Sequence, residues 1–295
     1  MMRRVATRPE PEIVADAHHP LEHYFRNERL PHIWCPGCGL GTSMSCLAAA
    51  FDHLKLDVDD VSVVSGIGCS GRLAGYMRPD SYHTTHGRAL PFATGLRVAL
   101  EKTKPGHKVV VFSGDGDLFS IGGNHFIHAA RRNIDLSVFC VNNFNYGMTG
   151  GQVGPTTPLG SKGTTAPYGM FEHPFNLPYL AASSGAPYVA RWTTLHVHRL
   201  QRAMEEAIEK KGFTFVEIIG PCPTNYGRRN GLPTGLDEMR YYRDEAIIQN
   251  FADPKEAEII PGKPFIVGTF VDEDTPDYLA IYEKFAQDHF GVSAK

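Results

Sequence analysis

The stretches Gly114-Asp115-Gly116-Asp117 and Val141-Asn142-Asn143-Phe144-Asn145-Tyr146-Gly147 decide the expected fold. Each stretch follows an apolar run, at 108–113 and 136–141, that is typical of a buried strand. Between the two runs, residues 121–132 have helical spacing. The pattern therefore predicts a β-α-β unit with polar side chains at the carboxyl ends of both strands, where open parallel sheets bind ligands.

Three oxygen donors are expected at these strand ends. They are the carboxylate of Asp115, the side-chain amide of Asn143 and the backbone carbonyl of Asn145. Magnesium prefers hard oxygen ligands and keeps water or phosphate oxygens in its other positions. Glycines on both sides of Asp115 let the backbone approach a diphosphate closely. The alternative is an ordinary β-α-β unit with polar turns.

Length and composition exclude several classes of protein. A chain of 295 residues can bury a full core. The net charge is −3 and the chain has no basic block, so neither nucleic acid nor an anionic membrane surface is an expected partner. No apolar run reaches membrane-spanning length, and residues 1–32 lack the apolar centre of a secretory signal. We therefore expect a cytoplasmic protein.

The rest of the chain continues the alternation of strands and helices. Further strands are expected at 61–65, 186–191 and 213–219, and further helices at 42–53, 89–102, 195–211, 241–251 and 276–289. The segment 153–174 is rich in Gly, Pro, Thr and Ser, which is typical of a functional loop. The fold class that follows is α/β, a mostly parallel sheet flanked by helices with irregular N- and C-terminal extensions.

Gly66, Gly68 and Gly71 match the glycine spacing of a dinucleotide-binding turn after a strand. That fingerprint also needs a helix, a second strand and an acidic residue about 20 positions further on. The chain continues instead through residues 76–88, which have a loop-like composition. A nicotinamide site is therefore the less favoured interpretation.

Four cysteines are expected at the same edge of the sheet. Cys35 and Cys38 form a C-x-x-C pair, which also suits a redox dithiol. Cys69 and Cys222 each follow an expected strand. If those strands are parallel members of one sheet, all four thiols lie beside the proposed cofactor site.

Four thiolates can hold a [4Fe–4S] cluster or a zinc ion. Zinc sites commonly repeat the C-x-x-C pair, whereas Cys69 and Cys222 are isolated and far apart in the sequence. The pattern favours a cluster, with zinc and free thiols as the alternatives. Cys46 and Cys140 lie within apolar elements and are interpreted as buried small hydrophobic residues.

Six motifs occur in order along the chain. They are Cys-Pro-Gly-Cys-Gly at 35–39, Gly-Ile-Gly-Cys-Ser-Gly at 66–71, His-Gly-Arg-Ala-Leu-Pro at 86–91, Gly-Asp-Gly-Asp at 114–117, Asn-Asn-x-x-Tyr-Gly at 142–147 and Gly-Pro-Cys-Pro at 220–223. Over residues 31–226 the chain resembles the β subunit of the 2-oxoacid:ferredoxin oxidoreductases, which share a thiamine-diphosphate motif with decarboxylases and transketolases. The stretches 83–91 and 146–152 are most similar to the 2-oxoglutarate members.

The resemblance implies a set of cofactor ligands. Asp115, Asn143 and the Asn145 carbonyl would hold magnesium, which holds the diphosphate of thiamine diphosphate; Cys35, Cys38, Cys69 and Cys222 would hold a [4Fe–4S] cluster. The residues expected to bind the cofactor are Gly68, Cys69, His86, Gly114, Asp115, Gly116, Asp117, Asn143, Tyr146, Gly147, Met148 and Thr149.

The implied activity is oxidative decarboxylation of 2-oxoglutarate with coenzyme A to succinyl-CoA and carbon dioxide. Electrons pass through the cluster to ferredoxin, and the sequence can run backwards as reductive carboxylation. Alternatives are the same chemistry on pyruvate or branched-chain 2-oxoacids, and a non-oxidative thiamine decarboxylase or carboligase with structural zinc. A noncatalytic electron-transfer subunit also stays open.

Three residues are candidates for contact with the substrate. The Arg72 guanidinium can bind a carboxylate bidentately, and 2-oxoglutarate has a second carboxylate to satisfy. His125 is expected to donate to a substrate oxygen, and His86 to close the cofactor pocket. The alternative for Arg72 is a surface arginine or one paired within the protein; His128, three residues after His125, is interpreted as a packing residue.

The resemblance also implies a partner. Thiamine enzymes need a glutamate from a pyrimidine-binding domain, and this chain has room for only one such fold, so an α subunit would supply that residue in an αβ pair, doubled as (αβ)2. The expected organisation is an arm at 1–30, a thiamine-diphosphate and [4Fe–4S] domain at 31–226, and an extension at 227–295 that contacts the partner or covers the cluster.

Overall fold

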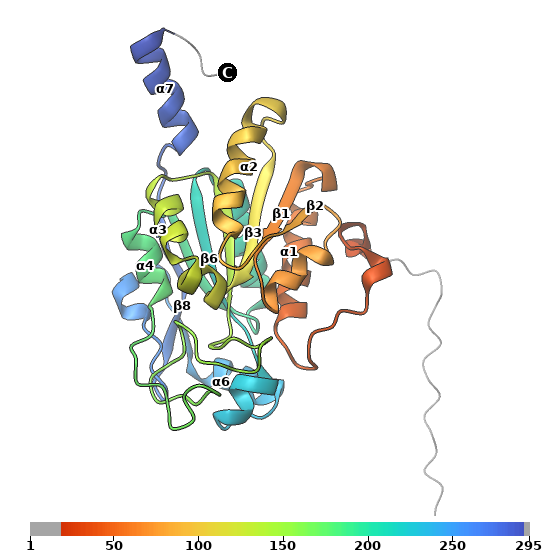
Figure 1. The fold of residues 1–295 in the computed structure, drawn as a ribbon, viewed down its shortest axis with the longest axis vertical. Helices are drawn as coiled ribbons and strands as arrows, with labels where there is room; N and C mark the ends of the chain where they lie inside the picture. The colour runs from red at the N-terminus through yellow and green to blue at the C-terminus, as the bar shows by residue number, and fades with distance from the viewer. Residues whose placement is uncertain (1–18, 292–295) are drawn as a thin grey trace, which may run out of the picture.

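The computed structural model describes residues 19–291, and they build one eight-stranded sheet with helices on both faces (Figure 1). The strands are β1 (Val61–Ser65), β2 (Asp80–His83), β3 (Lys108–Gly114), β4 (Leu136–Asn142), β5 (Tyr188–Thr193), β6 (Phe213–Ile219), β7 (Ala246–Ile248) and β8 (Phe265–Asp272). Their order across the sheet is β2-β1-β3-β4-β6-β5-β8-β7. All neighbouring pairs are parallel except β5 and β8.

The longer helices are α1 (Leu40–His53), α2 (Ala89–Thr103), α3 (Gly123–Arg131), α4 (Leu177–Ser183), α5 (Val197–Glu209), α6 (Gly235–Glu245) and α7 (Tyr278–Phe290). Short helical turns are η1 (Pro20–Tyr24), η2 (Asn27–Arg29), η3 (Val58–Asp60), η4 (Ser70–Gly75), η5 (Gly116–Ile121), η6 (Pro223–Gly227) and η7 (Pro254–Ala257). Both η5 and η6 are π-helical, a geometry that often marks functional sites.

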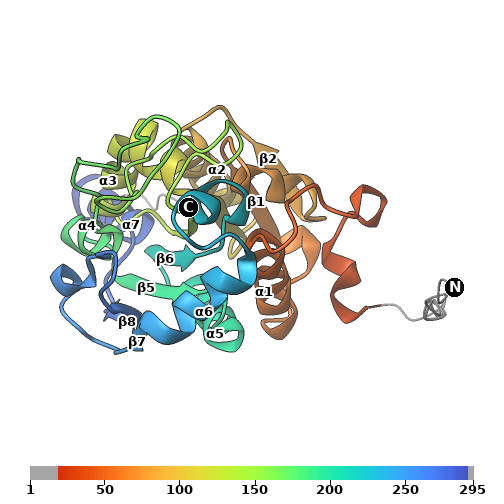
Figure 2. The ribbon, with the colours of Figure 1, turned by 90° about the horizontal axis from the view of Figure 1, so that it is seen from below.

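Two apolar cores lie on opposite faces of the sheet, which is why the central strands are buried along their whole length. Apolar residues of α1 and α5 form one core with side chains of β1, β3, β4, β5 and β6. Those of α2, α3 and α4 form the other. Figure 2 shows the same two layers, with α1 and α5 on one side of the sheet and α2, α3 and α4 on the other.

The expected α/β class is confirmed, and the strand expected at 213–219 has the bounds of β6. Strand β2 was not expected because its four residues are partly exposed and include Asp80 and His83. The helix expected at 241–251 is wrong beyond Glu245, because residues 246–248 form β7 beside β8. Strand β8 was also missed, although it joins the main sheet against β5.

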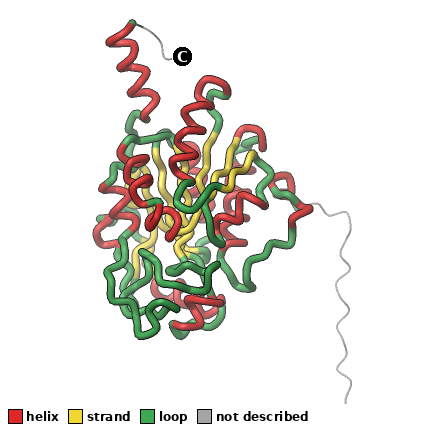
Figure 3. The backbone as a smooth tube through the Cα atoms, in the orientation of Figure 1, coloured by secondary structure: helices red, strands yellow, loops and turns green. Residues whose placement is uncertain are grey.

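The two ends of the sheet differ in what lies beyond them. Figure 3 shows much of the loop backbone, including the long loop before α4, gathered with α6 beyond one end of the strands. Helix α7 projects from the opposite end (Figure 1). Only its residue Ala286 is buried, while Ile281, Tyr282 and Phe285 are each about half exposed.

Residues 1–18 of the arm expected at 1–30 lie outside the described residues. From η1 onward the arm packs against the body: the Arg26 N–H donates to the Tyr76 carbonyl at 2.8 Å, and Phe25 pairs with Met77 in an isolated bridge. Over residues 19–291, no helix is both long enough and apolar enough to cross a membrane.

Candidate functional site

The sheet brings the expected site residues to one edge. Strands β1, β3, β4 and β6 are consecutive neighbours and all parallel, so their carboxyl ends meet at the same edge. Cys69 follows β1, Asp115 follows β3, Asn143 follows β4 and Cys222 follows β6. The strands that precede Cys69 and Cys222 are therefore parallel members of one sheet, as the expected grouping of the thiols requires.

A cavity of about 190 Å³ lies at this edge of the sheet. Every residue that the sequence predicts to bind the cofactor lines it, and so does Asn145. Ile67 and Ser70 also line the cavity and were not expected. Both lie next to predicted residues in the Gly66–Gly71 stretch, which was the one signal that could have found them.

Asp115 is one of two buried carboxylates that line the cavity, with 3% of its surface exposed; the other is Asp117. Burial raises the pKa of the Asp115 carboxyl to about 7, and the nearby Glu217 carboxylate adds a smaller effect in the same direction. The Thr156 hydroxyl donates to Oδ2 of Asp115 and opposes the shift. The backbone N–H groups of Gly116 and Asp115 oppose it as well, yet burial outweighs all three, so this carboxylate at the cavity suits a bound cation.

The turn after β4 places two amide side chains beside this carboxylate. Asn143 and Asn145 are each 7% exposed. The Asn145 amide donates to the Asn143 carbonyl at 2.7 Å, and Phe144 between them has a left-handed φ of 62°. The Asn142 side chain accepts from the Phe144 N–H at 3.1 Å. These bonds fix the turn, whose residues Asn143 and Asn145 line the cavity.

Asn142 is in turn held by a buried ion pair that was not predicted from the sequence. Its amide donates to Glu217 at 2.7 Å, and Arg191 Nε donates to the other oxygen of Glu217 at 2.6 Å. Arg191 is 1% and Glu217 0% exposed. Breaking a buried pair of this kind commonly costs about 3–5 kcal/mol, so the pair keeps the end of β4 rigid. The two charges lie inside apolar strands, and only the tertiary fold shows that they meet.

Asp117 has a structural environment although it lines the cavity. Its Oδ1 accepts from the Ile67 N–H at 3.1 Å and the Gly87 N–H at 2.7 Å, and its Oδ2 accepts from the Ser113 hydroxyl at 2.9 Å. The His86 ring bonds Oδ1 at 2.6 Å through Nδ1. Asp117 thus ties three loops together and orients His86.

Gly66 is required by the same contact. A Cβ at Gly66 would lie 2.0 Å from Oδ2 of Asp117, so no larger residue fits there. Gly116 plays a comparable part against Tyr146, since a Cβ at Gly116 would lie 2.2 Å from Cε1 of that ring. The glycines of these motifs therefore allow close packing around the cavity rather than a dinucleotide turn.

The four cysteines of the expected cluster lie near one another beside the cavity. The pKa of the Cys38 thiol is raised to about 12, mainly by burial. Charge repulsion from three nearby thiols adds to this rise: those of Cys222, Cys69 and Cys35. The sulfurs of Cys69 and Cys222 lie 3.6 and 3.5 Å from the point that a Cβ on Gly147 would occupy. Cys35 is exposed and Cys222 is buried.

A single metal ion and a cluster need different spacings of their cysteine sulfurs. Within residues 19–291, no group of three or more His, Cys, Asp or Glu side chains is close enough to share one metal ion. A single zinc ion needs all its sulfurs at about 2.3 Å. A cluster of several iron and sulfide atoms has its cysteine ligands further apart than a single ion does.

Segments far apart in the sequence hold these cysteines. Trp34 Nε1 donates to the Cys69 carbonyl at 2.8 Å, and Glu238 of α6 accepts from the Cys222 N–H at 3.0 Å. Burial raises the pKa of Glu238 to about 8. A Cβ on Gly37 would lie 3.2 Å from the Gly235 Cα, which places the start of α6 directly on the C-x-x-C loop.

The predicted catalytic residues are divided among different places. His86 lines the cofactor cavity. Arg72 is exposed and lines a neighbouring cavity instead. His125 lies half-buried in the first turn of α3, outside the lining of the cofactor cavity; burial lowers its pKa, and the Arg88 and His128 charges lower it further.

Comparison with known proteins agrees with this geometry. Residues 66–218 match the family described as thiamine pyrophosphate enzyme, C-terminal TPP binding domain. This match covers more than half of the chain, so the chain is a thiamine diphosphate enzyme component with a cofactor-binding domain of that family.

Similar proteins narrow the family further. The 2-oxoglutarate synthase subunit KorB of Methanocaldococcus jannaschii is 49% identical over 91% of this chain and 98% of its own. The 2-oxoacid:ferredoxin oxidoreductase subunit beta of Saccharolobus solfataricus is 42% identical over 65% of this chain and 62% of its own. A solved structure of 2-oxoglutarate:ferredoxin oxidoreductase from Magnetococcus marinus, with 2-oxoglutarate, coenzyme A and succinyl-CoA bound, has a TM-score of 0.80, 32% identity and 92% coverage of both chains. The chain belongs to the β subunits of the 2-oxoacid:ferredoxin oxidoreductases.

Proposed function

We propose that this chain is the β subunit of a 2-oxoglutarate:ferredoxin oxidoreductase. The enzyme converts 2-oxoglutarate and coenzyme A to succinyl-CoA and carbon dioxide, and the released electron pair leaves one electron at a time for ferredoxin. The observation that carries the proposal is Cys69, which lines the cofactor cavity and also lies among the four clustered cysteines. One residue thus joins the place of decarboxylation to the place of electron transfer. Reductive carboxylation is the same sequence in reverse.

Asp115, Asn143 and the Asn145 carbonyl are proposed to hold magnesium and, through it, the cofactor diphosphate. Their burial at the cavity and their hard oxygen donors support this role. When bound, thiamine diphosphate supplies the nucleophilic carbon and the electron sink for decarboxylation. Asp117 keeps the His86 ring at the cavity, where it can shield the reacting centre from water. His125, which lies outside that lining in the first turn of α3, is proposed to donate to a substrate oxygen there.

Cys35, Cys38, Cys69 and Cys222 are proposed to hold the [4Fe–4S] cluster. Bound iron keeps such thiols deprotonated, which offsets the high pKa that burial gives Cys38 and Cys69 without metal. The exposed Cys35 marks the side from which ferredoxin can approach closely. Part of the extension at 227–295 covers the cluster, since α6 packs on the C-x-x-C loop.

The site needs a second subunit. Its volume of about 190 Å³ is below the range of about 300–1,000 Å³ that encloses a whole ligand of this size. The side chains that line it, all within the described residues, include no glutamate that could activate the cofactor. Tyr168 is 99% and Phe171 83% exposed in the loop beyond the same end of the sheet, which marks an interface. We propose that the α subunit covers this end, and that two αβ pairs assemble as (αβ)2.

The isolated chain is expected to show no turnover, because the cavity and the activating glutamate are completed by the partner. The chain and its co-expressed complex, both purified without oxygen, are assayed with 2-oxoglutarate, coenzyme A and methyl viologen. Dye reduction by the complex alone supports the proposal. Turnover by the chain alone would refute it, and a complex that loads cofactor but oxidises no 2-oxoacid would show that the activity is a different one.

Arg72→Met is expected to raise KM for 2-oxoglutarate by the equivalent of about 1–2 kcal/mol of lost binding. Arg72 lies on η4, and the first residue of η4, Ser70, lines the cofactor cavity. The Arg72 guanidinium itself lines the neighbouring cavity, so we place it at the border between the two, where the second carboxylate of bound 2-oxoglutarate would lie. Pyruvate has no second carboxylate and should lose much less. The measurement is kcat/KM for both acids in the complex, with the exposed Arg78→Met as the matched control. An unchanged KM for 2-oxoglutarate rules the role out.

A further inference from the structure

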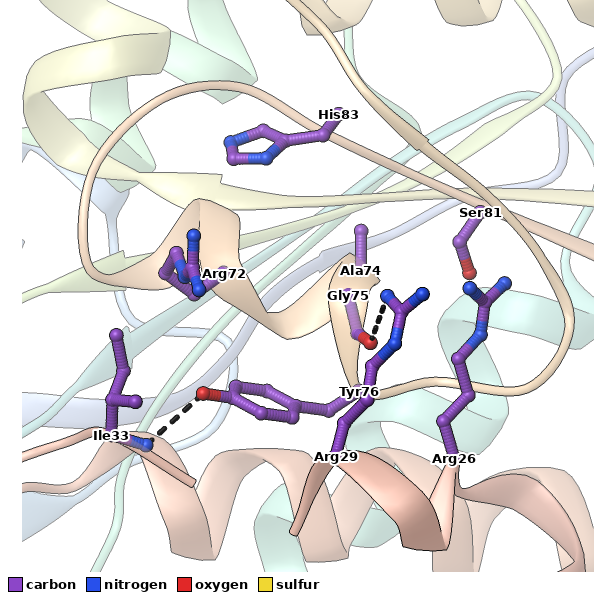
Figure 4. A pocket seen from close by; sticks show the side chains of 9 residues that line it. All are labelled: Arg26, Arg29, Ile33, Arg72, Ala74, Gly75, Tyr76, Ser81 and His83. Carbon is purple, nitrogen blue, oxygen red and sulfur yellow. Dashed lines mark hydrogen bonds between the residues drawn. The ribbon is translucent and has the colours of Figure 1, made fainter. Parts of the chain in front are cut away.

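A second cavity lies beside η4, and its polar lining is strongly cationic (Figure 4). Its volume is about 470 Å³, which is within the range of pockets for whole ligands. Three arginines and one histidine line it, with no aspartate or glutamate: Arg26, Arg29, Arg72 and His83. Ile33, Ala74 and Tyr76 supply less polar wall.

The arginines come from two separate segments that are tied together. Figure 4 shows Arg26 and Arg29 rising from the N-terminal arm toward the segment that carries Arg72 and His83. Nη1 of Arg29 donates to the Gly75 carbonyl at 3.0 Å. The Tyr76 hydroxyl accepts from the Ile33 N–H at 3.0 Å. The arm is thus held on η4 by directed bonds, and the cationic wall is a fixed feature of the fold.

These charges are poorly compensated inside the chain. The ion pairs formed among residues 19–291 give Arg26 and Arg72 no carboxylate partner, and Arg29 has only the exposed Glu28 at 3.9 Å. Like charges gathered around one cavity repel each other, and an anion in the cavity would relieve that repulsion. Guanidinium forks bind phosphate and carboxylate oxygens bidentately, so a ligand with several such groups gains most.

The cationic cavity adjoins the cofactor cavity. Cys69 and Ser70 line the cofactor cavity, whereas Arg72, Ala74 and Gly75 line the cationic one. The Arg72 N–H donates to the Cys69 carbonyl at 3.3 Å, so one helical turn separates the two spaces. A molecule anchored by its anionic end among the arginines would reach the cofactor with its other end.

We infer that this cavity is a binding site for a phosphate-bearing co-substrate, held by Arg26 and Arg29 of the arm, whereas Arg72 lies on its side nearest the cofactor cavity. The inference rests on the proposed function, in which coenzyme A is the co-substrate that carries several phosphate groups and a distant reactive thiol. The arginines bind its phosphates, and the wall of Ile33 and Tyr76 contacts a less polar part of the molecule. The arm expected at 1–30 then contributes to catalysis rather than only to packing.

The test is steady-state kinetics of the αβ complex with the double variant Arg26→Gln/Arg29→Gln. KM for coenzyme A is expected to rise about tenfold or more, since two charge-assisted contacts are lost. KM for 2-oxoglutarate should change by less than about twofold, because the oxoacid does not use the arm. Electron release from 2-oxoglutarate without coenzyme A should be unchanged. Pyrophosphate should compete with coenzyme A in the unmodified complex and lose this effect in the double variant.

Matched controls separate the loss of an anion site from a general loss of surface charge. Arg78→Gln removes one nearby exposed charge that does not line the cavity, and Arg29→Lys keeps the charge while changing the Gly75 contact. An unchanged KM for coenzyme A in the double variant overturns the inference, as does an equal rise with Arg78→Gln or an equal rise for both substrates. Loss of ferredoxin-linked turnover with KM for coenzyme A unchanged also overturns it and assigns the arginines to the acceptor protein.

The inference can fail separately from the proposed function. An unmodified complex that oxidises no 2-oxoacid contradicts the proposed function, and equilibrium dialysis of coenzyme A with the unmodified and double-variant complexes then decides on the cavity. Weaker retention by the double variant supports the site, and equal retention overturns it.

Discussion

Asp115→Ala is expected to abolish magnesium-dependent binding of thiamine diphosphate to the complex, lowering cofactor affinity by about 100-fold or more. Even residues that only support metal ligands change affinity by about 10- to 100-fold, and Asp115 is proposed to contact the ion directly. Its carboxylate is buried at the cavity, the oxygens of the second buried carboxylate, Asp117, already accept from protein donors, and Asn143 and Asn145 supply only neutral donors, which cannot balance a divalent cation. The readout is a calorimetric titration of thiamine diphosphate with and without magnesium.

The same variant should leave the folded chain intact. Burial disfavours the charged carboxylate and raises its pKa to about 7, so the side chain stabilises the metal-free fold little. Asp59→Ala, at an exposed carboxylate in η3, is the matched control and should bind cofactor normally. Cofactor binding by Asp115→Ala that still depends on magnesium would remove Asp115 from the site. Loss of binding together with a large fall in the melting temperature would show a structural role instead.

Cys222→Ser should remove most of the iron and acid-labile sulfide from protein purified without oxygen. The unmodified complex is expected to contain about four irons and four sulfides for each copy of this chain, apart from any held by its partner. A serine hydroxyl is a poor ligand for such a cluster, and the three remaining cysteines leave one iron unsupported. The visible absorption of the cluster and electron transfer to ferredoxin should fall together.

Cys46→Ser provides the matched control for this substitution. Cys46 is buried in α1, its thiol donates to the Val197 carbonyl at 3.7 Å, and none of the four cysteines of the proposed cluster influences its pKa. Its replacement should leave iron and sulfide contents unchanged. Zinc without sulfide in the unmodified protein would contradict the cluster and favour a non-oxidative thiamine enzyme. Full iron content in Cys222→Ser would remove that residue from the ligand set.

The general place of the site was predictable from the sequence. Cys69, Asp115, Asn143 and Cys222 each follow an apolar run, and a βα alternation implies parallel strands whose carboxyl ends share one edge. Local pattern therefore carried long-range information, because the handedness and direction of such units are nearly invariant. All the residues expected to bind the cofactor line one cavity for this reason.

Other parts were beyond sequence reasoning because they depend on which loops meet. Nothing in the spacing of Gly-Asp-Gly-Asp distinguishes Asp115, which faces the cavity with one hydroxyl partner, from Asp117, which bonds the N–H groups of Ile67 and Gly87. Thr156 is one of several threonines in a loop without periodicity. Strand β8 was missed although residues 265–271 are rich in aromatic and β-branched side chains; only its antiparallel place beside β5 depends on a tertiary contact.

The sequence by itself determined the class of fold, the edge of the sheet that holds the cofactor cavity and the six motifs of the family, because each depends on residues that are close along the chain. The tertiary structure decided which charges share an environment. Arg72 lies with Arg26 and Arg29 rather than in the cofactor cavity, since the arm folds back onto η4. Arg191 and Glu217 meet between adjacent strands. Charge pairing is set by distance in space, which the order of residues does not contain.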